Sequence, residues 1–134
     1  MVANIDTIKT KLIKYFSSHQ QVKMAFLYGS YAKGRQLPGS DIDIAVYLTE
    51  GYSKDDIDSV WDELIALLKK DVELLVLNDA NEAIAWAAIR GIPLAVKDQK
   101  LYLNFMLAVS SAAMDLQQDL EEIWQRKQEK QNAR

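Results

Sequence analysis

Apolar residues recur along this chain with two different periods, and the period changes from one segment to the next. Steps of three and four residues are typical of amphipathic helices. They predict helices over residues 4–18, 53–70, 80–90 and from about 100 onward. Short apolar runs between these segments are rich in strand-forming residues. They predict strands over residues 22–28, 41–48, 72–77 and 92–96.

A few residues mark where these elements end. Pro38 and Gly39 favour a turn before the second strand, because proline is excluded from helix interiors and glycine permits a sharp bend. Gly91 is typical of a residue that closes a helix, and Pro93 places the fourth strand at a sheet edge. The long C-terminal helix is expected to fray into a polar tail over residues 125–134.

This order of elements predicts an α/β (α+β) fold in which a small mixed β-sheet carries helices on one face. With 134 residues, the chain is expected to form a single domain, residues 1–134, large enough to bury a core. A composition that is 49% hydrophobic and 26% charged is that of a soluble globular protein. A long C-terminal helix completes the prediction.

Charge and residue usage exclude several classes of function. The net charge of −3 and the pI near 5.1 disfavour a nucleic-acid partner, which needs clustered positive charge. Without cysteine the chain has no disulfide, zinc–thiolate site or thiol nucleophile. The N-terminal segment does not resemble a signal peptide, and the apolar segment 83–96 is too short to cross a membrane. We therefore expect a cytoplasmic protein with no membrane contact.

Two carboxylates begin the second predicted strand. Asp41 and Asp43 are two residues apart, so strand alternation directs both side chains to the same side while Ile42 and Ile44 enter the core. Neighbouring carboxylates repel one another unless a cation lies between them. Mg²⁺ binds such groups together with water and substrate phosphate oxygens. The pair therefore indicates a magnesium site.

A Gly-Ser pair follows the first predicted strand. Gly29 lets the backbone approach a ligand closely, and a helix that starts at Ser30 directs free N–H groups toward an anion. Ten residues separate this pair from Asp41. Together the two halves indicate a site for a metal-bound triphosphate.

These residues resemble the GS-x10-DxD signature of the polymerase-beta-like nucleotidyltransferase superfamily. The flanking segments, residues 27–34 and 40–46, are similar to its minimal nucleotidyltransferase branch, called MNT or MntA-like. Members of this branch are antitoxins paired with HEPN-domain (HepT-like) RNase toxins. The resemblance runs from about residue 24 to residue 97 and implies the fold of the superfamily.

The resemblance also implies an activity and a set of site residues. Asp41 and Asp43 would hold two Mg²⁺ ions, as in two-metal nucleotidyl transfer, and Glu73 would be the third carboxylate, where aspartate is commoner in the branch. Gly29 and Ser30 would bind the phosphates of ATP. Further nucleotide-binding candidates are Lys33, Arg35 and Ser40. The implied reaction is transfer of AMP from ATP to a tyrosine of the HEPN toxin, which silences the RNase.

Several alternatives stay open from the sequence alone. Asp71 has the same strand parity as Glu73 and is a rival third carboxylate, and Lys33 and Arg35 could be solvated loop cations. His19, the only histidine, lies in a polar loop and receives no role. The protein could instead be a noncatalytic antitoxin that masks its toxin, or a nucleotidyltransferase that acts on a small molecule.

Overall fold

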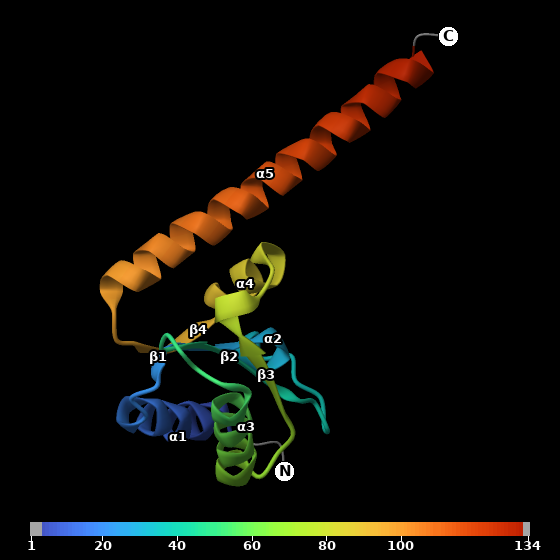
Figure 1. Ribbon diagram of the computed structural model, residues 1–134. Helices are drawn as coiled ribbons and strands as arrows, with labels where there is room; N and C mark the ends of the chain where they lie inside the picture. The colour runs from blue at the N-terminus through green and yellow to red at the C-terminus, as the bar shows by residue number, and fades with distance from the viewer. Residues whose placement is uncertain (1–3, 133–134) are drawn as a thin grey trace.

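The computed structural model describes residues 4–132, with the side chains of all of these except residues 113–121 and 129–132 (Figure 1). Four strands form one sheet in the order β3-β2-β1-β4. The strands are β1 (Val22–Tyr28), β2 (Ile42–Leu48), β3 (Val72–Val76) and β4 (Ile92–Val96). The β1 strand pairs antiparallel with β2 and β4, and β2 pairs parallel with β3, so the predicted mixed sheet is confirmed. Pro93 lies on an edge strand, as expected.

The helices lie close to their predicted positions. They are α1 (Ile5–Ser18), the short α2 (Gly29–Ala32), α3 (Lys54–Leu68), the 3-10 turn η1 (Leu77–Asp79), α4 (Glu82–Ile89) and α5 (Gln99–Asn132). Ser53 caps α3 by a reciprocal pair of hydrogen bonds with Asp56, which satisfies two N–H groups that a helix start leaves free. Asn81 caps α4 in a similar way, its side chain accepting from the N–H of Ile84.

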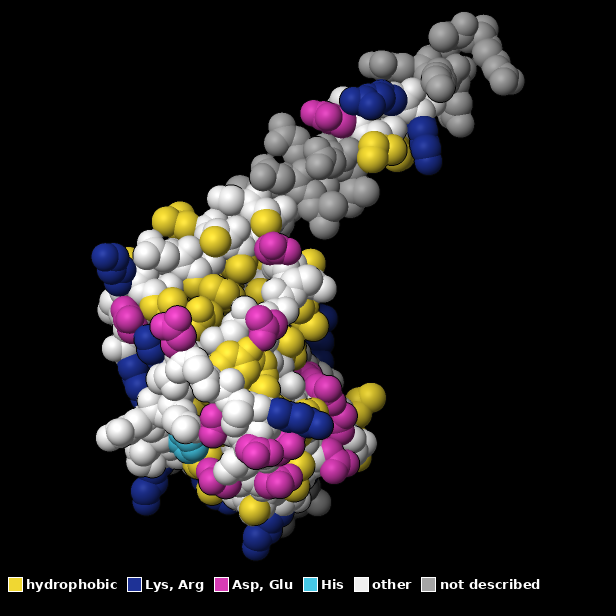
Figure 2. Space-filling view, in the orientation of Figure 1, with side chains coloured by type: hydrophobic (Ala, Val, Ile, Leu, Met, Phe, Trp, Pro, Cys, Tyr) yellow, Lys and Arg dark blue, Asp and Glu magenta, His cyan; other side chains and the backbone are white. Residues whose placement is uncertain are grey.

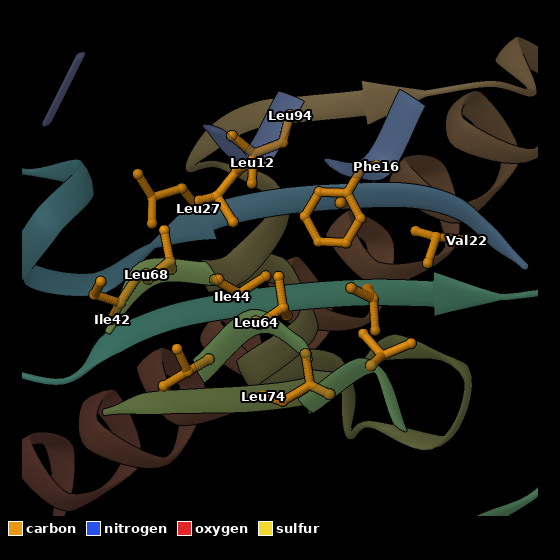
Figure 3. Close-up of a cluster of buried hydrophobic side chains, with 14 of the residues drawn as sticks. Leu12, Phe16, Val22, Leu27, Ile42, Ile44, Leu64, Leu68, Leu74 and Leu94 are labelled. Atoms are coloured by element: carbon orange, nitrogen blue, oxygen red, sulfur yellow. The ribbon is translucent and has the colours of Figure 1, made fainter. Parts of the chain in front are cut away.

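One face of the sheet packs against α1 and α3. Buried aliphatic side chains from both helices meet alternate residues of the strands, as Figure 3 shows. The labelled members of this core are Leu12, Phe16, Val22, Leu27, Ile42, Ile44, Leu64, Leu68, Leu74 and Leu94. Ile42 and Ile44 are fully buried here, as strand alternation predicts, so the intervening Asp43 must point to the other face.

The second face of the sheet is also covered, which corrects the expectation of helices on one face only. Met24, Phe26 and Ala45 pack there against α4 and the first part of α5, including Val109. The physical reason is that the central strands are apolar at nearly every position, which is typical of strands buried on both sides. Asp43 lies on this face near the junction of β1 and β2, where it stays partly exposed beside the packing of α4 and α5.

Helix α5 extends well beyond the body of the molecule (Figure 1). The expected fraying tail from residue 125 is wrong, because the helix continues to Asn132. Its end is rich in Glu, Gln, Lys and Arg, which are good helix formers, and Arg126 pairs with Glu122 one turn earlier at 3.9 Å. Within residues 4–132, no helix combines the length and apolar character that crossing a membrane requires.

Candidate active site

Three side chains form a row across the sheet where β1 ends and β2 and β3 begin. Tyr28 is the register partner of Asp43 on the antiparallel side, and Glu73 is its partner on the parallel side. Register partners on neighbouring strands project to the same face, with about 4.8 Å between strands. The sheet therefore brings Asp43 and Glu73 together, although thirty residues of chain separate them.

Asp41 lies one residue before β2, at an exposed position, and its charge acts on Asp43. Burial raises the pKa of the Asp43 carboxyl above its usual value, and the charges of Asp41 and Glu73 raise it further. Burial also raises the pKa of Tyr28 to about 12, with the charges of Asp43 and Glu73 adding to the effect. Asp41 and Glu73 thus lie near enough to Asp43 for their charges to act on it, beside a half-buried tyrosine.

Gly29 is the point of closest approach between the Gly-Ser pair and this row. Its φ of +72° lies in the left-handed region that favours glycine. A Cβ atom built there would lie 2.1 Å from Oδ2 of Asp43, a distance that real contacts do not reach. Gly29 and Asp43 therefore lie directly against one another.

A cavity of about 400 Å³ opens beside Gly29, between α2 and the end of α4. Its volume lies in the range of small-molecule binding sites. Two cations line it, Lys33 at the end of α2 and Arg90 at the end of α4. The remaining walls are Tyr28, Gly29, Ala32, Ala87, Gly91 and Ile92. A pocket with two cations thus adjoins the row of carboxylates through Gly29.

The family model described as Polymerase beta, Nucleotidyltransferase matches residues 10–100 of the chain. The chain belongs to the polymerase-beta-like minimal nucleotidyltransferases. A relative from Methanocaldococcus jannaschii, "Putative protein adenylyltransferase MJ0435", is 43% identical over 78 residues, which cover 58% of this chain and 83% of the relative.

Solved structures of MntA antitoxins from HEPN–MNT pairs share the fold of this nucleotidyltransferase. A toxin–antitoxin crystal structure with AMP-PNP matches at 25% identity and a TM-score of 0.70, covering 87% of this chain and 95% of the other. A second toxin–antitoxin structure, of a tyrosine-to-alanine mutant, matches at 26% identity and a TM-score of 0.67, covering 92% and 96%. The antitoxin bound to a tri-AMPylated HEPN toxin of Shewanella oneidensis, 22% identical over 91% of this chain and 97% of that chain, has a TM-score of 0.66 and supports the fold alone.

The carboxylates of this nucleotidyltransferase fit magnesium in their chemistry, since oxygen ligands from one or two carboxylates are what Mg²⁺ takes in proteins. Within residues 4–132, no three Asp, Glu, His or Cys side chains converge closely enough to hold a metal ion as they stand. Repulsion among like charges favours orientations that keep Asp41, Asp43 and Glu73 apart. Asp41 and Glu73 are exposed, so they can rotate toward Asp43 without any repacking of the core.

The remaining predicted nucleotide-binding residues are Ser30, Arg35 and Ser40. Ser30 follows Gly29 in α2, and its backbone carbonyl accepts a hydrogen bond from the N–H of Arg35 at 2.8 Å. Arg35 is exposed and does not line the cavity, unlike Lys33. The hydroxyl of Ser40 accepts from the N–H of Leu37 at 2.8 Å, so it stabilises the turn before β2.

The rival carboxylate Asp71 lies apart from the row. It lines a second cavity, with Trp61 of α3, and its carbonyl accepts a hydrogen bond from the N–H of Ile42 at 2.9 Å. The charges that raise the pKa of Asp43 are those of Asp41 and Glu73. The structure therefore places Glu73, rather than Asp71, beside Asp43.

Sequence reasoning missed Arg90 and Tyr28 as members of the site. Tyr28 belongs to the row only because β1 pairs with β2 in this register. Arg90 reaches the cavity only because β4 pairs with β1, a contact between segments more than sixty residues apart. Neither pairing leaves a local signal in the residues themselves, so periodicity and spacing could not have found them.

Proposed function

We propose that this nucleotidyltransferase transfers AMP from ATP to a tyrosine hydroxyl of a HEPN-type RNase toxin and thereby silences it. The observation that carries the proposal is the register of β2 and β3, which sets Asp43 and Glu73 side by side next to Gly29. The relative named as a protein adenylyltransferase and the toxin–antitoxin structure with AMP-PNP support the choice of ATP and of a protein acceptor.

In this proposal Asp41, Asp43 and Glu73 hold two Mg²⁺ ions. Bound Mg²⁺ would supply charge neutralisation at the α-phosphate and at the departing pyrophosphate. The residues themselves position the reactants, because Gly29 leaves room for the phosphates to approach Asp43. Ser30 donates its hydroxyl to the β- or γ-phosphate, and Lys33 faces the same chain of phosphates from the cavity wall.

The reaction balances without any further reactant. The tyrosine oxygen of the toxin forms a bond to the α-phosphorus of ATP, and the bond from that phosphorus to the bridging oxygen of the β-phosphate breaks. Pyrophosphate leaves, and the phenol proton passes to a carboxylate of the row.

The toxin needs a surface on which to dock, and we propose the free part of α5. Ile123 and Trp124 lie there with 49% and 62% of their surface exposed, beyond the body of the molecule. Exposed aromatic side chains are typical anchors of protein interfaces.

Figure 2 shows acidic side chains gathered over the region of α3, at a distance from this helix. The acidic face of α3 disfavours a nucleic-acid substrate there.

The test is incubation of the purified toxin with the wild-type protein, ATP and Mg²⁺, followed by intact-mass spectrometry. We expect the toxin to gain the mass of AMP and to lose RNase activity. The double variant Asp41→Asn with Asp43→Asn keeps the side-chain volumes but removes both charges, and it is expected to leave the toxin unmodified.

Three outcomes would contradict the proposal. Full labelling by the double variant would remove these carboxylates from the reaction. Protection of cells by the double variant at wild-type abundance, with no modified toxin, would show that masking by binding is sufficient. Labelling of small-molecule hydroxyls but not of toxin would point to a different acceptor.

A further inference from the structure

We propose that Arg90 is a phosphate-binding residue, and that it and Lys33 receive the triphosphate of ATP in the cavity between α2 and α4. The inference rests on the proposed function and adds to it a residue from outside the Gly-Ser and Asp-x-Asp motif. It also assigns the cavity a ligand chemistry, that of a polyphosphate anion.

Close backbone packing sets the position of Arg90. A Cβ atom on the next residue, Gly91, would lie only 2.3 Å from the carbonyl oxygen of Leu27, so the junction of α4 and β4 lies directly against β1. Gly29 comes two residues after Leu27, directly after β1, and lies against Asp43. The cavity therefore has Arg90 on one wall and Gly29 on another, and Gly29 in turn lies against Asp43.

The guanidinium of Arg90 is also held in orientation. Its Cζ atom lies 5.1 Å from the centre of the Trp86 ring, one helical turn earlier in α4, which is the geometry of a cation–π contact. Stacking on the ring leaves the edge of the guanidinium free to donate paired hydrogen bonds, and this fork matches the oxygens of a phosphate. Among the side chains that the structure describes, neither Arg90 nor Lys33 forms an ion pair.

Charge favours the phosphates over the adenine base as the ligand of this pocket. Two cations line one cavity, and the other lining residues are small or apolar apart from Tyr28. Their side chains provide few hydrogen-bonding groups that could recognise the edge of a base. A polyanion between Lys33 and Arg90 would also bring its α-phosphate toward Gly29 and the row of carboxylates.

The test is calorimetric titration of the full chain with ATP and with AMP, each in the presence of Mg²⁺. For Arg90→Gln we expect ATP to bind about 10- to 100-fold more weakly, the loss of one charge-assisted phosphate contact. AMP, which lacks the β- and γ-phosphates, is expected to change by less than about threefold. The matched control is Lys11→Gln, which removes an exposed cation of α1 and should bind both nucleotides as the wild type does.

Unchanged ATP affinity in Arg90→Gln, or equal losses for ATP and AMP, would overturn the proposal. Arg90 is exposed, so the variant is expected to keep the thermal midpoint of the wild type. If Arg90→Gln does not fold, the Arg90→Lys variant tests the proposal instead. It keeps the positive charge but loses the paired N–H donors of the guanidinium. An ATP affinity several-fold below that of the wild type would support the proposal, and wild-type affinity would overturn it.

The same samples separate this inference from the proposed function. If the wild type binds ATP and labels the toxin while Arg90→Gln binds ATP equally well, only the role of Arg90 fails. If the wild type labels no toxin although it binds ATP and the Arg90 variant binds it weakly, the acceptor is wrong and the pocket assignment stands.

Discussion

Substitution of Gly29 by alanine gives the sharpest mutational prediction. The new Cβ would lie 2.1 Å from Oδ2 of Asp43, so the carboxylate or the backbone must move by about 1 Å to restore an allowed contact. A displacement of about 1 Å in a catalytic group costs on the order of 100-fold in rate. The φ of +72° adds roughly 1 kcal/mol of backbone strain for a residue with a side chain.

Gly51 provides a matched control for the strain. Its φ of +85° also lies in the left-handed region, but a Cβ there meets nothing within 4 Å. Gly51→Ala should therefore lose roughly 1 kcal/mol of folding free energy, about 3–6 °C in thermal midpoint for a chain of this size. It should transfer AMP at the wild-type rate, because it lies in the turn between β2 and α3, away from the row.

The assay measures transfer of AMP from α-labelled ATP to the toxin alongside thermal unfolding of both variants. Gly29→Ala should lose at least 100-fold in rate and unfold at or below the midpoint of Gly51→Ala. Equal transfer rates in the two variants would refute the reasoning, since both glycines share the left-handed strain and a Cβ meets Asp43 only at position 29.

Three further predictions concern charge, partner and fold. The pKa of Asp43 is raised in the folded state, so ionisation of this carboxyl destabilises the fold. The destabilisation is absent below the unfolded pKa of about 3.9 and grows as pH rises through the folded pKa. Asp43→Asn should therefore unfold at a higher temperature than the wild type at pH 7, with the gain vanishing near pH 3; no gain at pH 7 would contradict this. Trp124→Ala should weaken toxin binding at least tenfold in surface plasmon resonance while leaving ATP affinity unchanged; full binding would exclude this helix as the docking surface. Asn78→Ala should lose about 2 kcal/mol in denaturant unfolding, because the side chain forms hydrogen bonds of 2.9 Å with both the N–H and the carbonyl of Leu48; a loss below about 0.5 kcal/mol would show that water replaces both.

The parts of the site that lie close together in sequence could be predicted from it. Asp41, Asp43 and Gly29 fall within fifteen residues, and strand alternation is enough to direct the two carboxylates to one side. The family resemblance also indicated Glu73, and the register of β2 and β3 now places it beside Asp43. Its role as a metal ligand stays a prediction.

The parts that depend on long-range packing could not be predicted. The sheet order puts β4 next to β1, and nothing local in either strand specifies that neighbour. The place of Arg90 in the cavity depends on that neighbour, so it was missed as well. The helices α4 and α5 on the second face were missed although the sequence contained a signal for them. The continuous apolar character of β1 and β2 was the available signal for helices on both faces.

The central claim is that Asp41, Asp43 and Glu73 form one metal centre next to the nucleotide. A crystal of the protein with AMP-PNP and Mn²⁺, measured at the manganese absorption edge, tests it most directly. We predict two anomalous peaks roughly 3.5–4 Å apart, each bound by at least one of these carboxylates, with the triphosphate between them and Gly29. Peaks bound elsewhere, or a nucleotide with no metal at these three residues, would contradict the account.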